Sequence, residues 1–511
     1  LAWLDGSSYP HPALTEVWKK ITFNGFHDLA AGSGIAVIYR DANEDFAAIA
    51  RDTHEVSQTA LQTVDARIDT SGGQGVPVLV WNTLGWTRTG PVTIHVQMPD
   101  ATSEVSVVDA KGNVLPSRVL DSDNKTHSFT LDVQAKDVPS MGYAVLHVVS
   151  GKRAFQSDLN AHDLTLENAH IKLTVDPKNG CITSLFDKKD RFETIAKAGC
   201  GNQLQAFKDH PAQYDAWNIN PDAFKHPMNI DEVDSVKLVQ QDGLRDTIEI
   251  KRHWQGSTFT QDISLDNGAD HAVVSNQVEW HEKHIFLKAA FPLAASAAQA
   301  TFEIPYGSIQ RPTTRNNSFE KAKFEVSAQR WADEGDGEHG FSLINDSKYG
   351  YDVIGNLLRI SLLRSPTYPD PHADQGHQAF RYALYPHAGN WLAAHTVEHG
   401  YNFNDRLLGE QVEAHQGDLP AEHSFASVSS PEVVLTAIKK AEDSDAVILR
   451  MYEIANKTEQ VKVKLPPGAT GVRITNLTET TDGATIPLSG DTATVTIHPY
   501  EILTIKASYK H

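Results

Sequence analysis

The sequence has few cysteines and lacks long apolar runs. Cys181 and Cys200 are the two cysteines among 511 residues, too few for a disulfide framework or for a zinc site built from CxxC pairs. We therefore expect two separate thiols in the core or near the surface, and low cysteine use favours a reducing compartment. No window approaches the roughly 18 consecutive apolar residues of a membrane span, so we expect no membrane insertion.

Basic residues are also scarce. Lys and Arg number 45 against 65 Asp and Glu, which gives a formal net charge of −20. Broad binding of nucleic acids or anionic membranes needs a basic surface, so we expect neither partner. The chain starts at Leu1 without an initiator Met, and no basic flank with an apolar run marks a signal peptide. We expect a processed, truncated or fragmentary chain.

The first seventy residues carry a helical pattern. Apolar residues recur with helical spacing between residues 14 and 21 and again between residues 35 and 64. The second series contains neither Pro nor Gly and predicts one helix of over thirty residues. A glycine-flanked turn that contains His27 and Asp28 separates the two series. Residues 71–75, with three glycines, then form a flexible linker.

Short β-strand patterns follow the linker. Val92–Val96 and Ala493–Ile497 alternate apolar and polar residues, and Gly, Asp, Asn and Pro separate such runs. We predict a mainly β fold, with a helical-bundle segment followed by several β-sandwich domains. The expected parts are the helical segment 1–70, a small sandwich at 76–150, a large sandwich (a supersandwich) at 157–395 and a C-terminal sandwich at 396–511. Residues 433–441 fit either a helix or a strand and turn.

Two segments have residue types that suit a sugar or a metal. An imidazole such as His27 can bind a metal, and a carboxylate such as Asp28 can bind a metal or sugar hydroxyls. Tyr214–Asn220 alternates aromatic residues with amides and a carboxylate, as sugar sites do. Each segment has a structural alternative, a helix end for the first and a β-turn around a core Trp for the second.

Two further segments lie in loops. An apolar strand leads into a Pro-rich loop with Arg364, His372 and His377, and polar loops at strand ends often carry function. The alternative is a solvated loop, since a five-residue gap does not hold two histidines in a metal-binding geometry. Asn345–Asp352 suits a tight structural turn. No complete catalytic set is present by spacing alone.

Taken together and in order, several motifs resemble the α-mannosidases of glycoside hydrolase family 38, in particular the bacterial and cytosolic type. The resemblance extends over essentially the whole chain. The motifs are Trp18–Asp28, Val80–Trp86, Gly201–Leu204, Tyr214–Trp217, Ile304–Gly307, Ala328–Asp333, Asn345–Gly350 and Leu363–Pro366.

The resemblance implies a zinc-dependent retaining exo-α-mannosidase that removes terminal α-mannose from oligosaccharides. One zinc ion grips two sugar hydroxyls, and an Asp nucleophile works with a second carboxyl as acid/base. His27 matches the family's zinc-binding histidine, and Asp28 matches a neighbouring Asp that contacts sugar hydroxyls. Arg364 matches an arginine that reaches the site, and Asp215 and Trp217 lie in a stretch that approaches the sugar.

The family's N-terminal α/β domain, with the nucleophile and the other zinc ligands, has no counterpart in this sequence. We therefore expect the C-terminal part of such an enzyme, with no catalytic residue in this chain and weak zinc binding through one histidine. Its partners would be the α-mannoside substrate and the missing N-terminal catalytic domain, its location would be cytoplasmic, and the sequence leaves a homo-oligomer open. The alternative is a stand-alone carbohydrate-binding or scaffold protein.

Overall fold

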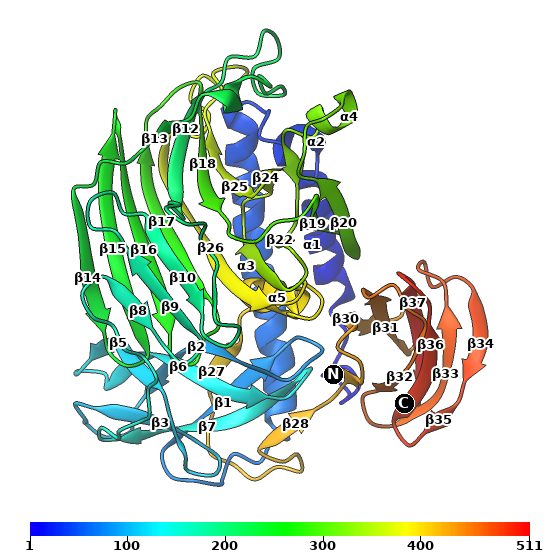
Figure 1. The fold of residues 1–511 in the computed structure, drawn as a ribbon. Coiled ribbons are helices and arrows are strands. Elements are labelled where there is room, and N and C mark those ends of the chain that lie inside the picture. The colour runs from blue at the N-terminus through cyan, green and yellow to red at the C-terminus, as the bar shows by residue number, and fades with distance from the viewer. Residues whose placement is uncertain (511) are drawn as a thin grey trace.

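The computed structural model describes residues 1–510 and begins with a helical segment (Figure 1). Its helices are α1 (His11–Asn24), α2 (His27–Ala30) and α3 (Ala36–Asp65), and α1 packs beside α3. Pro10 and Pro12 fit the start of α1 because early helix positions need no backbone donor. The uninterrupted α3 has 30 residues, slightly fewer than its apolar series predicts.

Residues 76–150, joined by two strands from residues 408–424, form two sheets packed face to face. The first sheet has the order β27-β1-β7-β3-β4 with β28 beside β7, and the second has the order β2-β6-β5. Val92, Ile94 and Val96 of β2 point inward at alternate positions, as their pattern predicts. The strands are β1 (Val76–Asn82), β2 (Arg88–Gln97), β3 (Val105–Asp109), β4 (Val114–Leu115), β5 (Ser117–Asp123), β6 (Ser128–Val138), β7 (Gly142–Ser150), β27 (Leu408–Gln411) and β28 (Glu422–Ser424).

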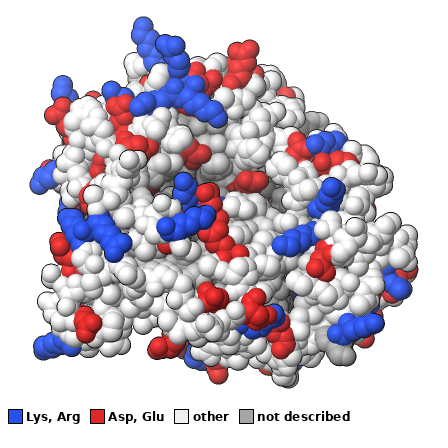
Figure 2. Space-filling model, turned by 90° about the horizontal axis from the view of Figure 1, so that it is seen from below, with Lys and Arg blue, Asp and Glu red and all other residues white. Residues whose placement is uncertain are grey.

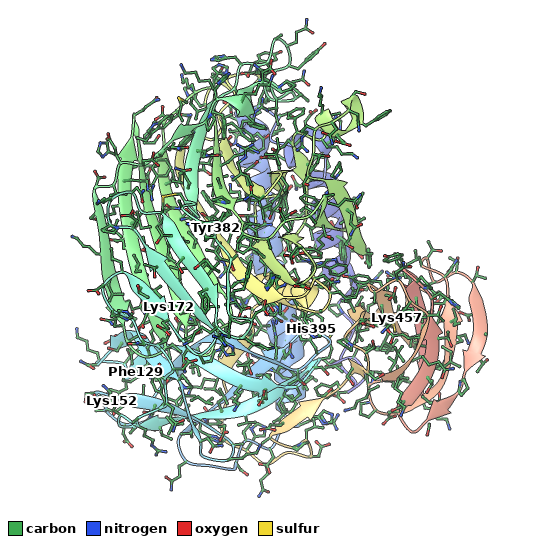
Figure 3. All side chains as sticks on the ribbon, viewed as in Figure 1. Phe129, Lys152, Lys172, Tyr382, His395 and Lys457 are labelled. Atoms are coloured by element: carbon green, nitrogen blue, oxygen red, sulfur yellow. A yellow bond between two sulfur atoms is a disulfide. The ribbon has the colours of Figure 1, made fainter. Side chains whose placement is uncertain are left out.

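Three sheets share the core of the large sandwich. Their orders are β11-β10-β9-β8, β13-β12-β18-β25-β24-β21 and β14-β15-β16-β17-β26-β23-β22-β19-β20. Tyr382 of β26, labelled in Figure 3, is buried in this core.

The elements of the large sandwich are β8 (Thr165–Glu167), β9 (Ile171–Val175), β10 (Ile182–Asp187), β11 (Phe192–Glu193), β12 (Gln203–Lys208), η1 (Ala223–Lys225), β13 (Met228–Asn229), β14 (Ser235–Gln241), β15 (Arg245–Trp254), β16 (Ser257–Asp266), β17 (Ala272–Trp280), β18 (Ile285–Pro292), β19 (Gln299–Ile304), β20 (Gly307–Pro312), α4 (Ser318–Lys321), β21 (Val326–Ser327), β22 (Trp331–Gly335), β23 (His339–Asn345), β24 (Gly350–Ile354), β25 (Leu357–Arg364) and β26 (Gly376–Ala388).

The C-terminal sandwich lies to one side of the molecule (Figure 1) and has its own core. Its sheets have the orders β29-β32-β36-β35 and β30-β31-β37-β33-β34. Residues 433–440, which fit either a helix or a strand, are a strand that pairs with β31. The strands are β29 (Ser427–Val428), β30 (Val433–Lys440), β31 (Ala446–Glu453), β32 (Glu459–Lys464), β33 (Ala469–Thr475), β34 (Asp482–Ile486), β35 (Leu488–Ser489), β36 (Thr492–Ile497) and β37 (Ile502–Tyr509).

The segment 396–424 does not follow the predicted boundary at residue 396. Helix α5 (Thr396–Asn404) packs on β22 and β23 of the large sandwich. Strands β27 and β28 then add to the edges of β1 and β7 in the small sandwich. Backbone pairing at those edges satisfies donors and acceptors that would otherwise stay open. The strands of the C-terminal sandwich start with β29, about thirty residues later than predicted.

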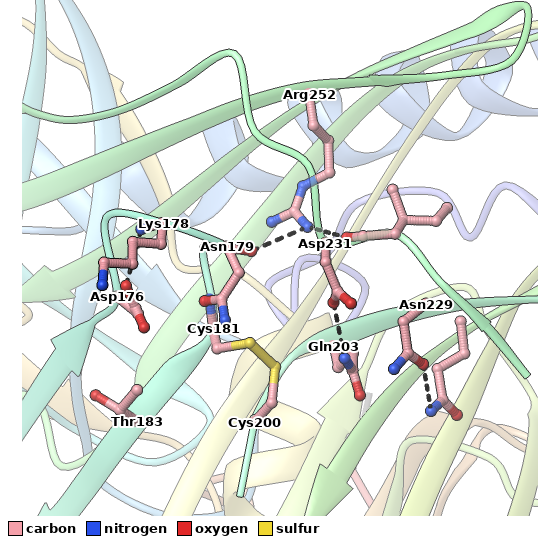
Figure 4. The surroundings of a disulfide bond; sticks show 12 residues. Asp176, Lys178, Asn179, Cys181, Thr183, Cys200, Gln203, Asn229, Asp231 and Arg252 are labelled. Atoms are coloured by element: carbon pink, nitrogen blue, oxygen red, sulfur yellow. Dashed lines mark hydrogen bonds between the residues drawn. A yellow bond between two sulfur atoms is a disulfide. The ribbon is translucent and has the colours of Figure 1, made fainter. Parts of the chain in front are cut away.

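The two cysteines form a disulfide, so the expectation of two separate thiols is wrong (Figure 4). The cause is a backbone bridge one residue further along, in which Ile182 and Gly201 exchange two N–H···O bonds of 2.9 Å. This bridge brings the neighbouring Cys181 and Cys200 to a Cα separation of 4.9 Å, within disulfide range. Disulfides persist in oxidising compartments, so cysteine use no longer supports the predicted cytoplasmic location.

The distribution of charged side chains and the character of the helices bear on the expected partners. Figure 2 shows acidic and basic side chains interspersed over one face of the molecule. Within residues 1–510, no helix is both long enough and apolar enough to cross a membrane. The prediction of a mainly β chain with an N-terminal helical segment is confirmed.

Candidate functional site

The predicted metal ligand lies on the short helix between the two long ones. Helix α1 ends at Gly25, whose backbone N–H donates to the carbonyl oxygens of Ile21 and Thr22. The chain then turns directly into α2. His27 opens α2, and its side chain is 79% exposed. Its Nε2 lies 3.4 Å from Asp28 Oδ2, so the two predicted residues present their polar atoms side by side.

Asp28 connects the helical segment to the large sandwich. Its Oδ1 accepts a hydrogen bond of 3.0 Å from Ser33 Oγ and another of 3.0 Å from Trp217 Nε1. Trp217 is 189 residues away in sequence, in the loop after β12. The structure therefore brings the two predicted sugar-binding segments into direct contact.

Exposed aromatic rings lie beside this contact. Trp217 is 47% exposed, Tyr214 65% and Tyr368 64%, and the rings of Trp217 and Tyr368 are 6.3 Å apart. Such rings, next to a carboxylate, offer apolar faces for stacking and a hydrogen-bond acceptor for hydroxyls. The arrangement suits a pyranose.

Arg364 points into the loop rather than away from it. Its Nε donates to Asp209 Oδ2 at 2.7 Å, Nη1 donates to Ala216 O at 3.0 Å, and Nη2 donates to Asp215 O at 2.6 Å. Nη2 also donates to Asn218 O. Four of the five guanidinium N–H groups are thus used to hold the loop that carries Trp217, and the direct sugar contact predicted for Arg364 stays a prediction.

Asp215 is also turned inward. Its Oδ2 accepts from Thr367 N at 2.7 Å, and Oδ1 lies 3.4 Å from His284 Nδ1. These contacts tie the 214–218 loop to the loop after β25. The direct role in sugar binding predicted for Asp215 stays a prediction, because its carboxylate is already engaged and only 16% exposed.

Two supporting residues carry no signal in the sequence beyond their place at a strand end. Asp209 follows β12 directly, is 2% exposed, and accepts from both Arg364 and Asn220 N (2.9 Å). His284 precedes β18, stacks on His210 with a ring separation of 4.2 Å, and bonds to Thr367 Oγ1 at 2.9 Å. Their function is visible only once the loops are folded together.

Acidic groups surround the helical turn. Burial raises the pKa of Tyr39, against a hydrogen bond from the Gly34 N–H (2.9 Å), and nearby carboxylates add to this shift. Those carboxylates are Asp374, Asp370 and Asp28. A site with this local negative charge favours cations and the hydroxyls of a neutral sugar over anionic ligands.

The His27–Asp28 pair fits part of a zinc site. Two ligands on one tetrahedral zinc ion lie about 3.3 Å apart when the bonds are about 2.0–2.1 Å, close to the 3.4 Å between His27 Nε2 and Asp28 Oδ2. The other carboxylate oxygen is held by Ser33 and Trp217, in the manner of outer-shell partners. Within residues 1–510, no third His, Cys, Asp or Glu completes the set.

Within residues 1–510, neither His372 nor His377 belongs to a cluster of three or more potential metal ligands. His377 Nδ1 pairs with Glu279 Oε1 at 2.7 Å. The Asn345 side chain accepts from the N–H groups of Ser347 and Lys348 at 3.0 and 2.7 Å, which confirms the predicted tight turn.

Three family models match the chain along its length. The alpha mannosidase middle domain matches residues 1–64, the glycosyl hydrolases family 38 C-terminal domain matches residues 166–372, and the family 38 C-terminal beta sandwich domain matches residues 432–505. The chain belongs to glycosyl hydrolase family 38. The family predicted from the motifs is confirmed.

Curated relatives of this family 38 chain include alpha-mannosidases. Alpha-mannosidase 2C1 of Mus musculus is 32% identical over 461 residues, which is 87% of this chain and 40% of the relative. Alpha-mannosidase 2C1 of Homo sapiens is 30% identical over 514 residues, which is 97% of this chain and 46% of the relative. The chain thus spans less than half the length of these relatives.

A solved family 38 structure has the same fold. A glycosyl hydrolase family 38 protein from Enterococcus faecalis matches with a TM-score of 0.84 and 17% identity, over all of this chain and 67% of that one. At this identity the likeness concerns the fold alone.

Proposed function

We propose that this chain is the C-terminal part of a zinc-dependent retaining exo-α-mannosidase that hydrolyses terminal α-mannose from oligosaccharides. The observation that carries the proposal is the hydrogen bond from Trp217 Nε1 to Asp28 Oδ1. It joins a potential metal ligand, a carboxylate and exposed aromatic rings at one place, although they come from distant parts of the sequence.

Each residue of the site has a distinct role in this proposal. His27 would hold the zinc ion, the bound ion would orient sugar hydroxyls, and Asp28 would accept hydrogen bonds from sugar hydroxyls. Trp217 fixes the Asp28 carboxylate through its indole N–H and offers its ring face to the sugar. Arg364 and Asp209 keep the loop of Trp217 in place.

Further protein surface is needed to complete the site. One histidine leaves a zinc ion short of the three or four protein ligands that it needs. The helices beside His27 expose large apolar side chains: Trp18 is 64% exposed, Phe23 79% and Phe26 56%. Such a patch is typical of a buried interface, which supports an N-terminal catalytic domain that covers it and supplies the nucleophile and the other ligands.

A test starts from the DNA upstream of the Leu1 codon. We expect an in-frame coding segment with a His-x-Asp pair and a nucleophile Asp. The product of the complete reading frame should hydrolyse an aryl α-mannoside, whereas the 511-residue chain alone should not. A reading frame that starts at Leu1, or turnover by the 511-residue chain alone, would overturn the proposal and favour a stand-alone carbohydrate-binding protein or a self-sufficient enzyme, respectively.

Two variants of the complete product sharpen the test. His27→Ala should abolish turnover and lower the bound zinc. His253→Ala is the matched control, because His253 is also an exposed histidine but lies on β15, away from the His27–Asp28 pair, and it should keep full activity. Equal activity of His27→Ala and His253→Ala would count against the proposed zinc ligand.

A further inference from the structure

A large cavity lies away from the His27–Asp28 site. Its volume is about 960 Å³, and its walls come from α3, the small sandwich, strands β16, β17 and β26, and α5. Three potential metal ligands on its wall, Asp270, His271 and His399, come from the turn between β16 and β17 and from α5. The turn and the helix are over a hundred residues apart in sequence and meet only in the folded chain.

The three side chains converge. Asp270 Oδ1 lies 3.0 Å from His271 Nδ1, and Asp270 Oδ2 lies 2.9 Å from His399 Nε2. One ligand atom from each residue can be chosen so that all three lie within 4.8 Å of one another. Their side chains are 40%, 29% and 21% exposed, respectively, so an ion from solvent can reach them.

A hydrogen bond at Nδ1 of His399 orients the ring so that its other nitrogen, Nε2, faces Asp270. His399 Nδ1 lies 3.1 Å from the carbonyl oxygen of His395, the residue that precedes α5 and is labelled in Figure 3. The His399 ring also stacks on Tyr385 with a centroid separation of 4.1 Å. Because Nδ1–H donates to the carbonyl, Nε2 faces the Asp270 carboxylate, either as an N–H that donates to it or, without that proton, as a lone pair that a metal ion can bind.

Without a metal, a proton on Nε2 joins His399 to Asp270 in a hydrogen bond of 2.9 Å, and a metal ion that displaces this proton can bind both the imidazole and the carboxylate. A metal-bound histidine almost always donates its other N–H to a carbonyl or a carboxylate, which is the geometry of His399 and His395. Two imidazoles and one carboxylate are also a common donor set for zinc and related divalent ions.

Four arginines line the same cavity: Arg88, Arg245, Arg381 and Arg406. Arg245 and Arg381 are paired with the carboxylates of Asp266 and Asp346, which offsets their charge. The cavity leaves room for water, which would complete the coordination of an open three-ligand site.

We propose that Asp270, His271 and His399 form a second metal site, which binds a divalent transition ion of the zinc class with water in the remaining position. The ion links the β16–β17 turn to α5 and stabilises the seam between them. This proposal does not depend on the mannosidase function, because none of its ligands belongs to the His27–Asp28 site.

The test uses the whole 511-residue chain after chelation and dialysis. Titration with zinc chloride, followed by calorimetry, should show one saturable site, and cobalt(II) in its place should give the visible absorption bands of a nitrogen-ligated ion. His399→Asn and His271→Asn should each weaken zinc binding at least tenfold. Zinc should raise the melting temperature of the unsubstituted chain and leave that of His399→Asn unchanged.

Two controls separate this site from other histidines. His377→Asn removes a surface histidine that pairs with a single carboxylate, Glu279, at 2.7 Å, and should leave zinc binding intact. His27→Ala should also leave it intact, so a failure of the proposed mannosidase site is distinguishable from a failure of this one. His271 lies at a turn, so its substitution avoids disruption of α5.

Absence of saturable zinc binding by the unsubstituted chain would overturn the proposal and leave a protonated His399 as the cation beside Asp270. Equal zinc affinity of the unsubstituted chain, His271→Asn and His399→Asn would overturn it as well. The cobalt spectrum provides an independent check, because a spectrum that persists unchanged in both variants places the ion elsewhere.

Discussion

A buried carboxyl in the large sandwich makes the stability of this chain depend on pH. Glu334 of β22 is 1% exposed, its Oε1 accepts from Ala297 N at 2.8 Å, and its Oε2 has no hydrogen-bond partner among the described residues. Burial raises the pKa of Glu334 to about 8, against the hydrogen bond from Ala297, and the neighbouring Asp333 adds to the shift. The folded chain therefore keeps a proton that the unfolded chain loses near pH 4.5.

The direction of the effect follows from proton binding. The stabilisation from protonated Glu334 is complete below about pH 4.5 and is lost as the pH rises towards 8. One pKa unit corresponds to about 1.36 kcal/mol, so the loss between pH 5 and pH 8 is about 4 kcal/mol. Glu334→Gln mimics the protonated form and should escape this loss.

Calorimetry at pH 5 and at pH 8 measures the difference between the two chains. At pH 5 the variant should melt close to the unsubstituted chain, and at pH 8 it should melt roughly 8–16 °C higher, since 1 kcal/mol shifts a domain of this size by about 2–4 °C. Glu338→Gln, an exposed position on the same hairpin, is the matched control. The reasoning would be refuted if the melting temperatures of Glu334→Gln and the unsubstituted chain differed by the same amount at pH 5 and at pH 8.

Three further changes test the loops and the disulfide. Arg364→Lys removes the planar guanidinium group that donates to three backbone carbonyls. Hydrogen bonds to charged groups contribute about 1.5–3 kcal/mol each, so amide exchange at residues 214–218 should accelerate at least tenfold. Serine at both Cys181 and Cys200 should lower the free energy of unfolding of the large sandwich by about 3 kcal/mol, measured by urea denaturation. Trp217→Phe keeps the ring but removes the donor to Asp28, and should lower kcat/KM of the complete enzyme about tenfold.

Matched variants control two of these experiments. Arg473→Lys changes an exposed arginine with a single carboxylate partner, and should leave amide exchange at residues 214–218 unchanged. Tyr214→Phe alters an exposed aromatic residue without touching the Asp28 hydrogen bond. Unchanged exchange in Arg364→Lys, unchanged stability without the disulfide, or equal kcat/KM for Trp217→Phe and the unsubstituted enzyme would each contradict the corresponding role.

Local patterns predict the elements well because they depend on neighbours in sequence. The apolar series before Val64 predicts α3, and the alternation around Ile94 predicts β2. Both patterns report which face of an element is buried. The motif with His27 and Asp28 likewise points to the turn that contacts the large sandwich.

Local sequence patterns do not predict contacts between segments that are distant in sequence. The disulfide depends on the bridge between Ile182 and Gly201, and no spacing rule foresees it. The inward direction of Arg364 depends on carbonyls that a loop 146 to 149 residues away turns towards it. The meeting of Asp270 with His399 has the same origin, since it requires α5 to pack beside the large sheet.

The central claim is that this chain completes a zinc-dependent mannoside site through the helical turn at His27. The most direct measurement is hydrolysis of an aryl α-mannoside by the product of the complete reading frame, assayed after chelation and again after zinc is restored. We predict that turnover disappears on chelation, returns with zinc, and stays absent in His27→Ala under both conditions. Turnover that survives chelation, or a His27→Ala variant as active as the unsubstituted enzyme, would contradict the account.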